Sequence, residues 1–221
     1  MRAGLFGGTF NPIHNGHLMV ARKVLDRLAL DRLHLIPCWT PPHKHPDYLA
    51  PADDRVRMIR LALPGDARIH LSEIEIQRRG PSYTIDTVDA FRTRLAPGAD
   101  LFLVMGLDAF LDIHTWKDHQ SLLAVVQPVV VTREIANAEP EADPMTRMDD
   151  FIRNQLSADY RLQDGENRWR TPAGRAIHHL STRPVAVSST MVRRRVREGK
   201  AITDLVPPAV GAYIERRELY R

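Results

Sequence analysis

Hydrophobic positions along the chain follow two alternating patterns. Short apolar runs, typical of buried strands, are separated by segments whose apolar residues recur every three or four positions, as on the inner face of an amphipathic helix. The runs predict strands near the N-terminus and over 33–37, 69–76, 101–105, 128–133, 176–180 and 185–187. The periodic segments predict helices over 18–28, 53–63, 85–95, 151–156 and 189–197, with a last one after 207. Strands that alternate with helices predict an α/β fold with a doubly wound, mostly parallel sheet.

The first strand leads into a helix through a glycine-rich turn, in the stretch from Gly4 to Leu18. Gly7 and Gly8 allow the backbone to approach a ligand closely, because no Cβ atom stands in the way. Asn15 is the predicted N-cap of the helix. A strand, a glycine turn and a helix start together aim backbone N–H groups at a phosphate, so this stretch is a candidate anion site.

Two histidines, His14 and His17, fall at the positive end of that helix dipole. Three interpretations compete: an ordinary turn with polar side chains, a metal site, and a nucleoside triphosphate site. The metal interpretation is weak, because the three-residue spacing differs from that of a zincin helix and no Glu lies between the histidines. The stretch also lacks the Gly-Lys-Ser/Thr of a P-loop and the G-x-G-x-x-G dinucleotide fingerprint.

A second strand-to-helix turn lies near the other end of the sequence. Ser188 or Ser189 is the predicted cap of the helix that follows, Thr190 adds a hydroxyl, and Arg193 lies one turn further on. Gly199 is a natural place for that helix to end. These groups predict either a second phosphate site or a capped surface helix, and a solvated basic face is the interpretation kept for the further arginines of the helix.

Composition narrows the class of protein without fixing its function. The 221 residues allow one or two domains, of which we expect a single domain over 1–221, and a hydrophobic content of 43% is enough for a sizeable core. A net charge of +4 suits anionic ligands such as nucleotides but does not by itself indicate nucleic acid binding. The only cysteine, Cys38, excludes an internal disulfide and fits a cytoplasmic protein, and no apolar run is long enough to cross a membrane.

Both of these turns resemble known signatures. Residues 14–17, His-Asn-Gly-His, match the His-x-Gly-His motif of a nucleotidyltransferase superfamily, and the longer run Gly7–His17 is similar to its adenylyltransferase branch. Residues 187–193, Val-Ser-Ser-Thr-Met-Val-Arg, resemble the second signature of the superfamily, Ile-Ser-Ser/Ala-Thr-x-Ile-Arg. The resemblance covers roughly residues 4–133 and 185–220, and it implies a Rossmann-like nucleotidyltransferase fold.

The middle of the chain makes the resemblance more specific. A Pro-Ser-Tyr-Thr segment is similar to the one with which nicotinate mononucleotide adenylyltransferases hold the pyridine carboxylate, and the resemblance assigns Tyr83 and Thr84 to it. From the residues alone, this segment is only a helix start capped by Ser82 or Thr84. The family's Thr-Trp pair implies that Trp116 stacks on the pyridine ring, whereas without that context it would cover an edge of the core.

Polar residues also follow predicted strands at their carboxyl ends, where open α/β sheets bind ligands. Asp108 matches the family's Gly-x-Asp, which implies a contact to ribose, and it is also a candidate cap for a helix over 109–113. Leu107 departs from the small or polar residue that relatives often carry beside it. Lys44 falls on the basic position of a Pro-Pro-His-Lys-like loop, and Arg133 lies where another strand ends.

The resemblance implies the reaction of bacterial nicotinate mononucleotide adenylyltransferases, in which ATP and nicotinate mononucleotide give the deaminated dinucleotide and pyrophosphate. Mg²⁺ is expected to arrive with ATP, no protein metal site is predicted, nucleic acid and membrane partners are not expected, and the oligomeric state is left open. The expected charge-stabilising residues are His14, His17, Lys44 and Arg193. The expected nucleotide contacts are Gly7, Gly8, Thr9, Phe10, Tyr83, Thr84, Gly106, Asp108, Trp116, Arg133, Ser188, Ser189 and Thr190.

Two alternatives stay open at this point. An adenylyltransferase for nicotinamide mononucleotide or phosphopantetheine shares the first and last signatures, but the Pro-Ser-Tyr-Thr and Thr-Trp elements argue against it. A nucleotide-binding or RNA-binding module with a basic face would bind ATP without turnover, or RNA with a strong salt dependence. The polar region 134–183 matches the family least and is assigned no function, and the preference for nicotinate over nicotinamide is not fixed by these motifs.

Overall fold

The chain forms two compact units, each made from two separate stretches of sequence. Unit 1 contains Met1–Leu5 and Tyr83–Pro184, and unit 2 contains Phe6–Ser82 and Val185–Arg221. Strand β1 (Arg2–Gly8) begins in unit 1 and ends in unit 2. The single domain expected over the whole chain stays a prediction. The structure, a computed structural model, describes residues 1–40, 49–63, 65–133, 143–163, 165, 167–171, 174–182 and 187–221.

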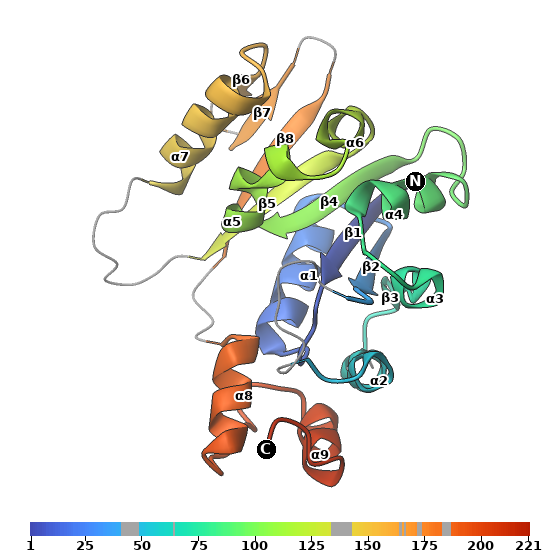
Figure 1. The fold of residues 1–221 in the computed structure, drawn as a ribbon. Coiled ribbons are helices and arrows are strands. Elements are labelled where there is room, and N and C mark those ends of the chain that lie inside the picture. The colour runs from blue at the N-terminus through green and yellow to red at the C-terminus, as the bar shows by residue number, and fades with distance from the viewer. Residues whose placement is uncertain are drawn as a thin grey trace. The chain divides into compact units, whose positions relative to one another are not determined.

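Unit 2 combines parallel strands with helices from both ends of the sequence (Figure 1). Its strands lie in the order β3-β2-β1, and β2 and β3 are parallel, with Leu33 opposite Ile69. Besides β1, its elements are α1 (Asn15–Arg27), β2 (Arg32–Pro37), α2 (Ala52–Ala62), β3 (Ile69–Leu71), α3 (Ile74–Arg78), α8 (Ser189–Arg197) and α9 (Pro208–Arg216).

Helix α1 confirms the periodic pattern that predicted it. Leu18, Ala21 and Leu25 are all buried, so the apolar stripe faces the core. The predicted N-cap is wrong by one residue, because the cap is His14 and the helix starts at Asn15. Asn15 has other partners: its backbone N–H donates to Leu205 O at 2.9 Å, and its side-chain Nδ2 donates to the carbonyl of residue 204 at 3.1 Å.

The strand expected over 69–76 is wrong in its second half. β3 ends at Leu71, and the N–H of Ser72 donates to Leu35 O at 2.9 Å before the chain turns into the short helix α3. Ile74 and Ile76 are buried on that helix. Two buried isoleucines at a spacing of two fit either one face of a strand or a short buried helix, and here the tertiary packing selects the helix.

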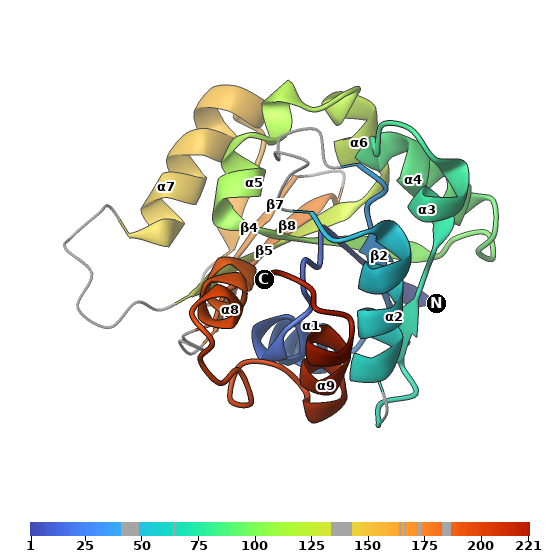
Figure 2. The same cartoon turned by 60° about the horizontal axis from the view of Figure 1, so that its bottom comes forward.

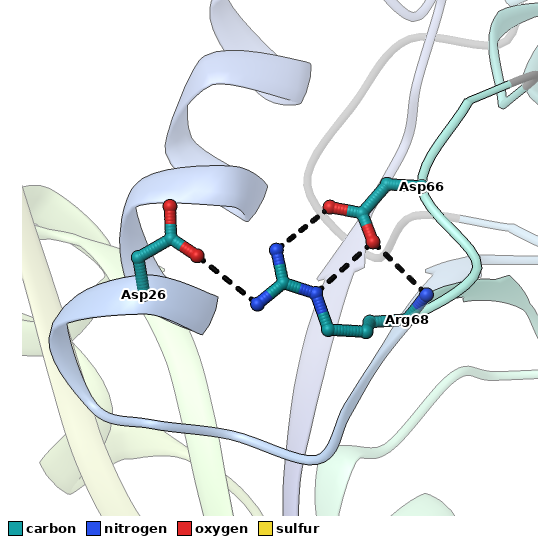
Figure 3. Close-up of polar contacts among 3 residues, drawn as sticks. All are labelled: Asp26, Asp66 and Arg68. Carbon is teal, nitrogen blue, oxygen red and sulfur yellow. Dashed lines mark hydrogen bonds and ion pairs between the residues drawn. The ribbon is translucent and has the colours of Figure 1, made fainter.

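A charged cluster links the end of α1 to the start of β3 (Figure 3). The Arg68 guanidinium donates to Asp26 Oδ1 at 3.0 Å and to both carboxylate oxygens of Asp66, at 3.1 Å and 2.9 Å. The N–H of Arg68 also donates to Asp66 Oδ1 at 3.0 Å. These hydrogen bonds from Arg68 lower the pKa of the Asp66 carboxyl. The cluster is exposed, so its role is to fix a surface turn.

Unit 1 carries the remaining strands (Figure 1). Their order is β1-β4-β5-β8-β7-β6, in which β4, β5 and β8 are parallel while β7 pairs antiparallel with both β8 and β6. The mostly parallel sheet that the sequence predicts is confirmed. The elements are α4 (Thr84–Arg92), β4 (Asp100–Gly106), α5 (Leu107–Leu111), α6 (His119–Val125), β5 (Gln127–Arg133), α7 (Pro144–Phe151), β6 (Arg161–Gln163), β7 (Arg168–Arg170) and β8 (Ala176–Thr182).

Two predicted elements in the second half of the chain differ from the structure. The helix expected over 151–156 begins earlier, at Pro144, and continues as a π-helical turn over Ile152–Leu156. The strand expected over 185–187 is not seen at Val187, which is buried but lies in no strand, and residues 185–186 lie outside the described part. In the described ranges, no helix is both long and apolar enough to cross a membrane.

Candidate functional site

The two histidines of the signature stack on each other at the start of α1. Their ring centroids are 3.7 Å apart with 23° between the planes, and His14 is only 2% exposed. The backbone N–H of His14 donates to Nδ1 of His17 at 3.3 Å. Because Nδ1 of His17 accepts this hydrogen bond, the neutral imidazole carries its own proton on Nε2. The arrangement therefore presents a fixed N–H donor at the positive end of a helix dipole.

The predicted glycines serve different purposes. A Cβ on Gly7 would meet no atom within 4 Å, so the backbone there faces open space that a ligand can enter. A Cβ on Gly8 would lie 3.2 Å from the ring of Phe10. Phe10 itself has a left-handed φ of 46° and stands edge-on to the His17 ring, with centroids 5.0 Å apart. Gly8 thus permits a ring contact that supports His17 from the side.

Gly16, the glycine of the His-x-Gly-His motif, is needed for close packing. A Cβ there would lie 3.0 Å from Val187 Cγ1 and 3.1 Å from the ring of His14. The absence of a side chain lets the segment before α8 approach the first turn of α1. Gly16 therefore joins the two signatures that the sequence places at opposite ends of the chain.

Helix α8 begins as its sequence predicts. Ser188 is the N-cap and accepts a hydrogen bond from the N–H of Met191 at 3.1 Å. Ser189 donates its hydroxyl proton to the carbonyl of Pro12 at 3.0 Å. The hydroxyl of Ser189 therefore holds the histidine loop (residues 7–17), while the N–H groups of Ser189 and Thr190, at the start of α8, lack acceptors within the helix.

Arg193 also binds the histidine loop. Its Nη1 donates to the carbonyl of Asn11 at 2.8 Å, and its Nη2 donates to Thr190 Oγ1 at 3.4 Å. Its Nε is buried and finds no acceptor among the described residues. Burial lowers the pKa of the guanidinium from its ordinary value, an effect that Tyr220 opposes and Arg197 reinforces. An arginine in this state is a partly desolvated cation suited to phosphate oxygens.

Sequence reasoning missed Arg55, which organises the ends of β1 and β2. The side chain is 1% exposed, and it donates to the carbonyls of Thr9, Cys38, Trp39 and Ala50 at 2.8–3.1 Å. Burial lowers the pKa of Arg55. One signal was present: Arg55 occupies a position on the apolar stripe of α2, next to Val56 and one turn before Ile59, where a solvated side chain is not expected.

Asp54, in the first turn of α2, does not cap that helix. Its carboxylate is 4% exposed and accepts hydrogen bonds from Tyr213 Oη at 2.7 Å and from Arg217 Nε at 3.2 Å. Asp54 therefore ties α2 to α9, which lie side by side in Figure 2. No local pattern reveals such a pair, because its members are far apart in sequence.

Unit 1 brings together the two segments expected at the pyridine ring. Tyr83 is the N-cap of α4, so the caps predicted at Ser82 and Thr84 are wrong. The Tyr83 ring is 42% exposed, with the ammonium of Lys117 4.7 Å from its centroid. Lys117 also donates to Asp86 Oδ1 at 2.9 Å. This contact fixes the residue that follows Trp116 against the start of α4.

Trp116 is half-buried, and its backbone N–H donates to Ile113 O at 3.0 Å, where a short 3₁₀ turn ends.

Gly106 and Asp108 lie at the carboxyl end of β4, as expected, and both are exposed. Asp108 does not cap the next helix. Gly106 is the cap of α5, and Asp108 belongs to its first turn, after the half-buried Leu107.

Two predicted residues are not placed in full. Lys44 lies outside the described residues. Arg133 is the last residue of β5, and its side chain is not described.

Each unit brings together its own set of predicted site residues: the stacked histidines with Ser188–Arg193 in unit 2, and Tyr83 with the Trp116 segment in unit 1. Over the described ranges, no group of three or more His, Cys, Asp or Glu residues could hold a metal ion.

Comparison with known proteins agrees with this geometry. The family model described as cytidylyltransferase-like matches residues 5–195. A probable nicotinate-nucleotide adenylyltransferase of Desulfatibacillum aliphaticivorans is 38% identical over all of both chains, and one of Pseudomonas putida is 40% identical over all of this chain and 95% of its own. A nicotinic acid mononucleotide adenylyltransferase of Plasmodium falciparum, solved with NaAD, shares the fold with a TM-score of 0.70 at 17% identity, covering 99% of this chain and 97% of that one.

The chain belongs to the cytidylyltransferase-like family of nucleotidyltransferases. Within it, the chain belongs with the nicotinate-nucleotide adenylyltransferases, since relatives of that name match it along its whole length.

Proposed function

We propose that the protein transfers the adenylyl group of ATP to nicotinate mononucleotide, giving nicotinate adenine dinucleotide and pyrophosphate. The observation that carries the proposal is the joining of the two signatures within unit 2. Ser189 and Arg193 both bind carbonyls of the histidine loop, so the donors of α1 and α8 are held on one framework. Two helix starts, a histidine N–H and a desolvated arginine form a cradle for a polyanion.

The reaction needs positioning and charge stabilisation rather than a covalent nucleophile. The phosphate of the mononucleotide is already anionic, so it attacks the α-phosphorus of ATP without a general base. The bond from the α-phosphorus to the bridging oxygen breaks, and pyrophosphate leaves with that electron pair. Donors that face the growing negative charge lower the barrier, because the protein orients them before the reaction.

In this scheme the chain's own cations and donors divide the work. His17 donates Nε2–H to an oxygen of the reacting phosphates, while the stacked His14 supports its ring from behind. Arg193 binds the departing phosphates through those N–H groups of its guanidinium that do not donate to the Asn11 carbonyl. Lys44 is assigned to the same phosphates by the resemblance. Mg²⁺ enters bound to the phosphates of ATP, as part of that substrate, with Thr9, Phe10 and Ser188–Thr190 as the further contacts.

Residues of unit 1 are assigned to the acceptor and the ribose. The first N–H groups of α4, after Tyr83, lack acceptors within the helix and suit the pyridine carboxylate. Trp116 offers a flat face to the pyridine ring. Asp108 is exposed at the end of β4, where a carboxylate can accept hydrogen bonds from ribose hydroxyls.

The test is pyrophosphate release by the purified protein with ATP and Mg²⁺. Nicotinate mononucleotide, nicotinamide mononucleotide and phosphopantetheine are offered separately, with ATP alone as the blank. We expect release with nicotinate mononucleotide at the highest kcat/KM. A preference for another acceptor would keep the chemistry and overturn the roles of Tyr83, Thr84 and Trp116. ATP binding without pyrophosphate release in any of these mixtures would favour the alternative of a nucleotide-binding module that catalyses no reaction.

A further inference from the structure

The five residues after α9 turn back toward the histidine loop. Figure 2 shows the chain leaving α9 and ending beside α8 within unit 2. Two residues of this segment, Glu218 and Tyr220, have left-handed φ angles of 53° and 68°, and neither is a glycine. Such angles are unfavourable for residues with a Cβ, so tertiary contacts must hold the segment in place. Two of these contacts are that of Arg217 with Asp54 and that of the Tyr220 hydroxyl with Asn11.

Tyr220 donates its hydroxyl proton to Asn11 Oδ1 at 2.8 Å. The same oxygen accepts the N–H of Ala50 at 3.0 Å, and Asn11 is 6% exposed. The backbone carbonyl of Asn11 is the acceptor that Arg193 binds at 2.8 Å. One buried residue of the histidine loop therefore joins Tyr220, through its side chain, to Arg193, through its backbone.

Tyr220 and Arg193 also line one cavity. Its volume is about 320 Å³, and Ala50 and Arg197 contribute to the same lining. Arg193 brings to it a guanidinium whose Nε has no acceptor among the described residues. The hydroxyl of Tyr220 donates to Asn11 of the histidine loop. The tyrosine therefore lines the cavity together with Arg193 and also contacts the loop.

We infer that Tyr220 is a positioning residue of the adenylyl transfer, acting through Asn11 on Arg193. The inference rests on the proposed function. With the hydroxyl present, Asn11 Oδ1 accepts hydrogen bonds from both Tyr220 and Ala50, and the backbone carbonyl of Asn11 is held toward Arg193. Without the hydroxyl, Oδ1 loses the donor from Tyr220, the loop is held less firmly, and the guanidinium loses its fixed direction relative to the phosphates of ATP.

The chain supplies a matched control. Tyr213 also donates its hydroxyl to a buried acceptor of unit 2, Asp54 Oδ1, at 2.7 Å. That contact ties α9 to α2 and touches neither the histidine loop nor Arg193. Tyr213→Phe and Tyr220→Phe each remove one hydroxyl from a tyrosine of the same part of the chain, so a difference between them reports on position rather than on the loss of a hydrogen bond in general.

The experiment compares both variants with the wild-type protein in kinetics, thermal unfolding and binding of the α,β-methylene analogue of ATP. For Tyr220→Phe we expect kcat/KM for ATP to fall about tenfold, because Tyr220 acts on the phosphates only through other residues. Its Kd for the analogue should rise in step, while the KM for nicotinate mononucleotide stays within about twofold. For Tyr213→Phe, the unfolding midpoint should fall and the constants for ATP should stay unchanged. Wild-type constants in Tyr220→Phe, or equal losses in both variants, would overturn the inference.

A double variant tests the route through Arg193. In an Arg193→Lys background, Tyr220→Phe should add little, because the bidentate group that it positions is already gone. Losses that multiply would show that Tyr220 acts by another route and would overturn the inference. If the wild-type protein releases no pyrophosphate, the proposed function fails, and the analogue's Kd in Tyr220→Phe still decides whether Tyr220 positions the phosphate-binding arginine.

Discussion

The backbone N–H of His14 donates to Nδ1 of His17 across the first turn of α1, at 3.3 Å. This bond sets the tautomer of His17, so that Nε2 carries the proton, while the His14 ring stacks on the His17 ring. The three-residue spacing of the signature follows from it, because the cap and the third residue of a helix are the positions that face each other at its start.

Replacing His17 by Ala should lower kcat/KM by ~10² to 10³, the usual cost of one preorganised donor. Binding of ATP should change less, because the donor is worth most when charge develops. Steady-state kinetics measure this, with His114→Ala as the control, since His114 is an exposed histidine of unit 1. Full activity in His17→Ala would remove the residue from the mechanism.

Two glycine variants separate packing from ligand approach. Gly16→Ala should destabilise the fold, because its Cβ would meet Val187 at 3.0 Å and the His14 ring at 3.1 Å. Gly7→Ala should fold normally, since its Cβ meets nothing within 4 Å, yet it should bind ATP more weakly because the methyl occupies the open side of the loop. Urea unfolding and ATP titration read the two effects. Unchanged ATP affinity in Gly7→Ala would contradict close approach of the ligand at that residue.

Arg55→Met should be strongly destabilising. It removes the Arg55 donors from four carbonyls, two of them in buried contacts and two in partly buried ones, and an unsatisfied buried group costs about 1–3 kcal/mol. We expect a loss of at least about 3 kcal/mol in the free energy of unfolding, measured by urea titration. Arg57→Met, an exposed change on the same helix, should cost under about 0.5 kcal/mol. Equal losses in the two variants would mean that Arg55 does not organise the strand ends.

Stability should fall as the pH drops from 6.5 toward 4. Burial is the main cause that lowers the pKa of both His34 and His178 to about 4. Between pH 6.5 and 4 the unfolded chain therefore binds more protons than the folded one, and the free energy of unfolding decreases as the pH falls. His178→Gln should flatten this slope, while His114→Gln should not. A wild-type unfolding free energy that is constant over this window would contradict the burial of these imidazoles.

Trp116→Ala should raise the KM for nicotinate mononucleotide more than that for ATP, because stacking on the pyridine ring is lost. Trp116→Phe should recover part of the affinity. Initial rates over a grid of both substrates provide the comparison. Equal changes in both KM values would show that Trp116 only covers the edge of the core.

What the sequence revealed here was local. The N-cap of α1 and the cap of α8 at Ser188 follow from short-range patterns, so they were predicted to within a residue. The roles of Arg55 and Asp54 were not predicted, because a buried charged side chain looks like a surface one in the sequence until its partners are known. Asn11 and Tyr220 are 209 residues apart, and a single hydrogen bond over that separation leaves no periodic signal. Motif resemblance, rather than periodicity, supplied the chemistry.

The most direct test of adenylyl transfer follows the α-phosphorus of ATP. The wild-type protein is incubated with Mg²⁺, nicotinate mononucleotide and ATP radiolabelled on its α-phosphorus, and the products are separated. The account predicts that the label enters nicotinate adenine dinucleotide, that the pyrophosphate formed is unlabelled, and that His17→Ala slows both together. Label that stays in ATP, or that is released as AMP without entering the dinucleotide, would contradict it.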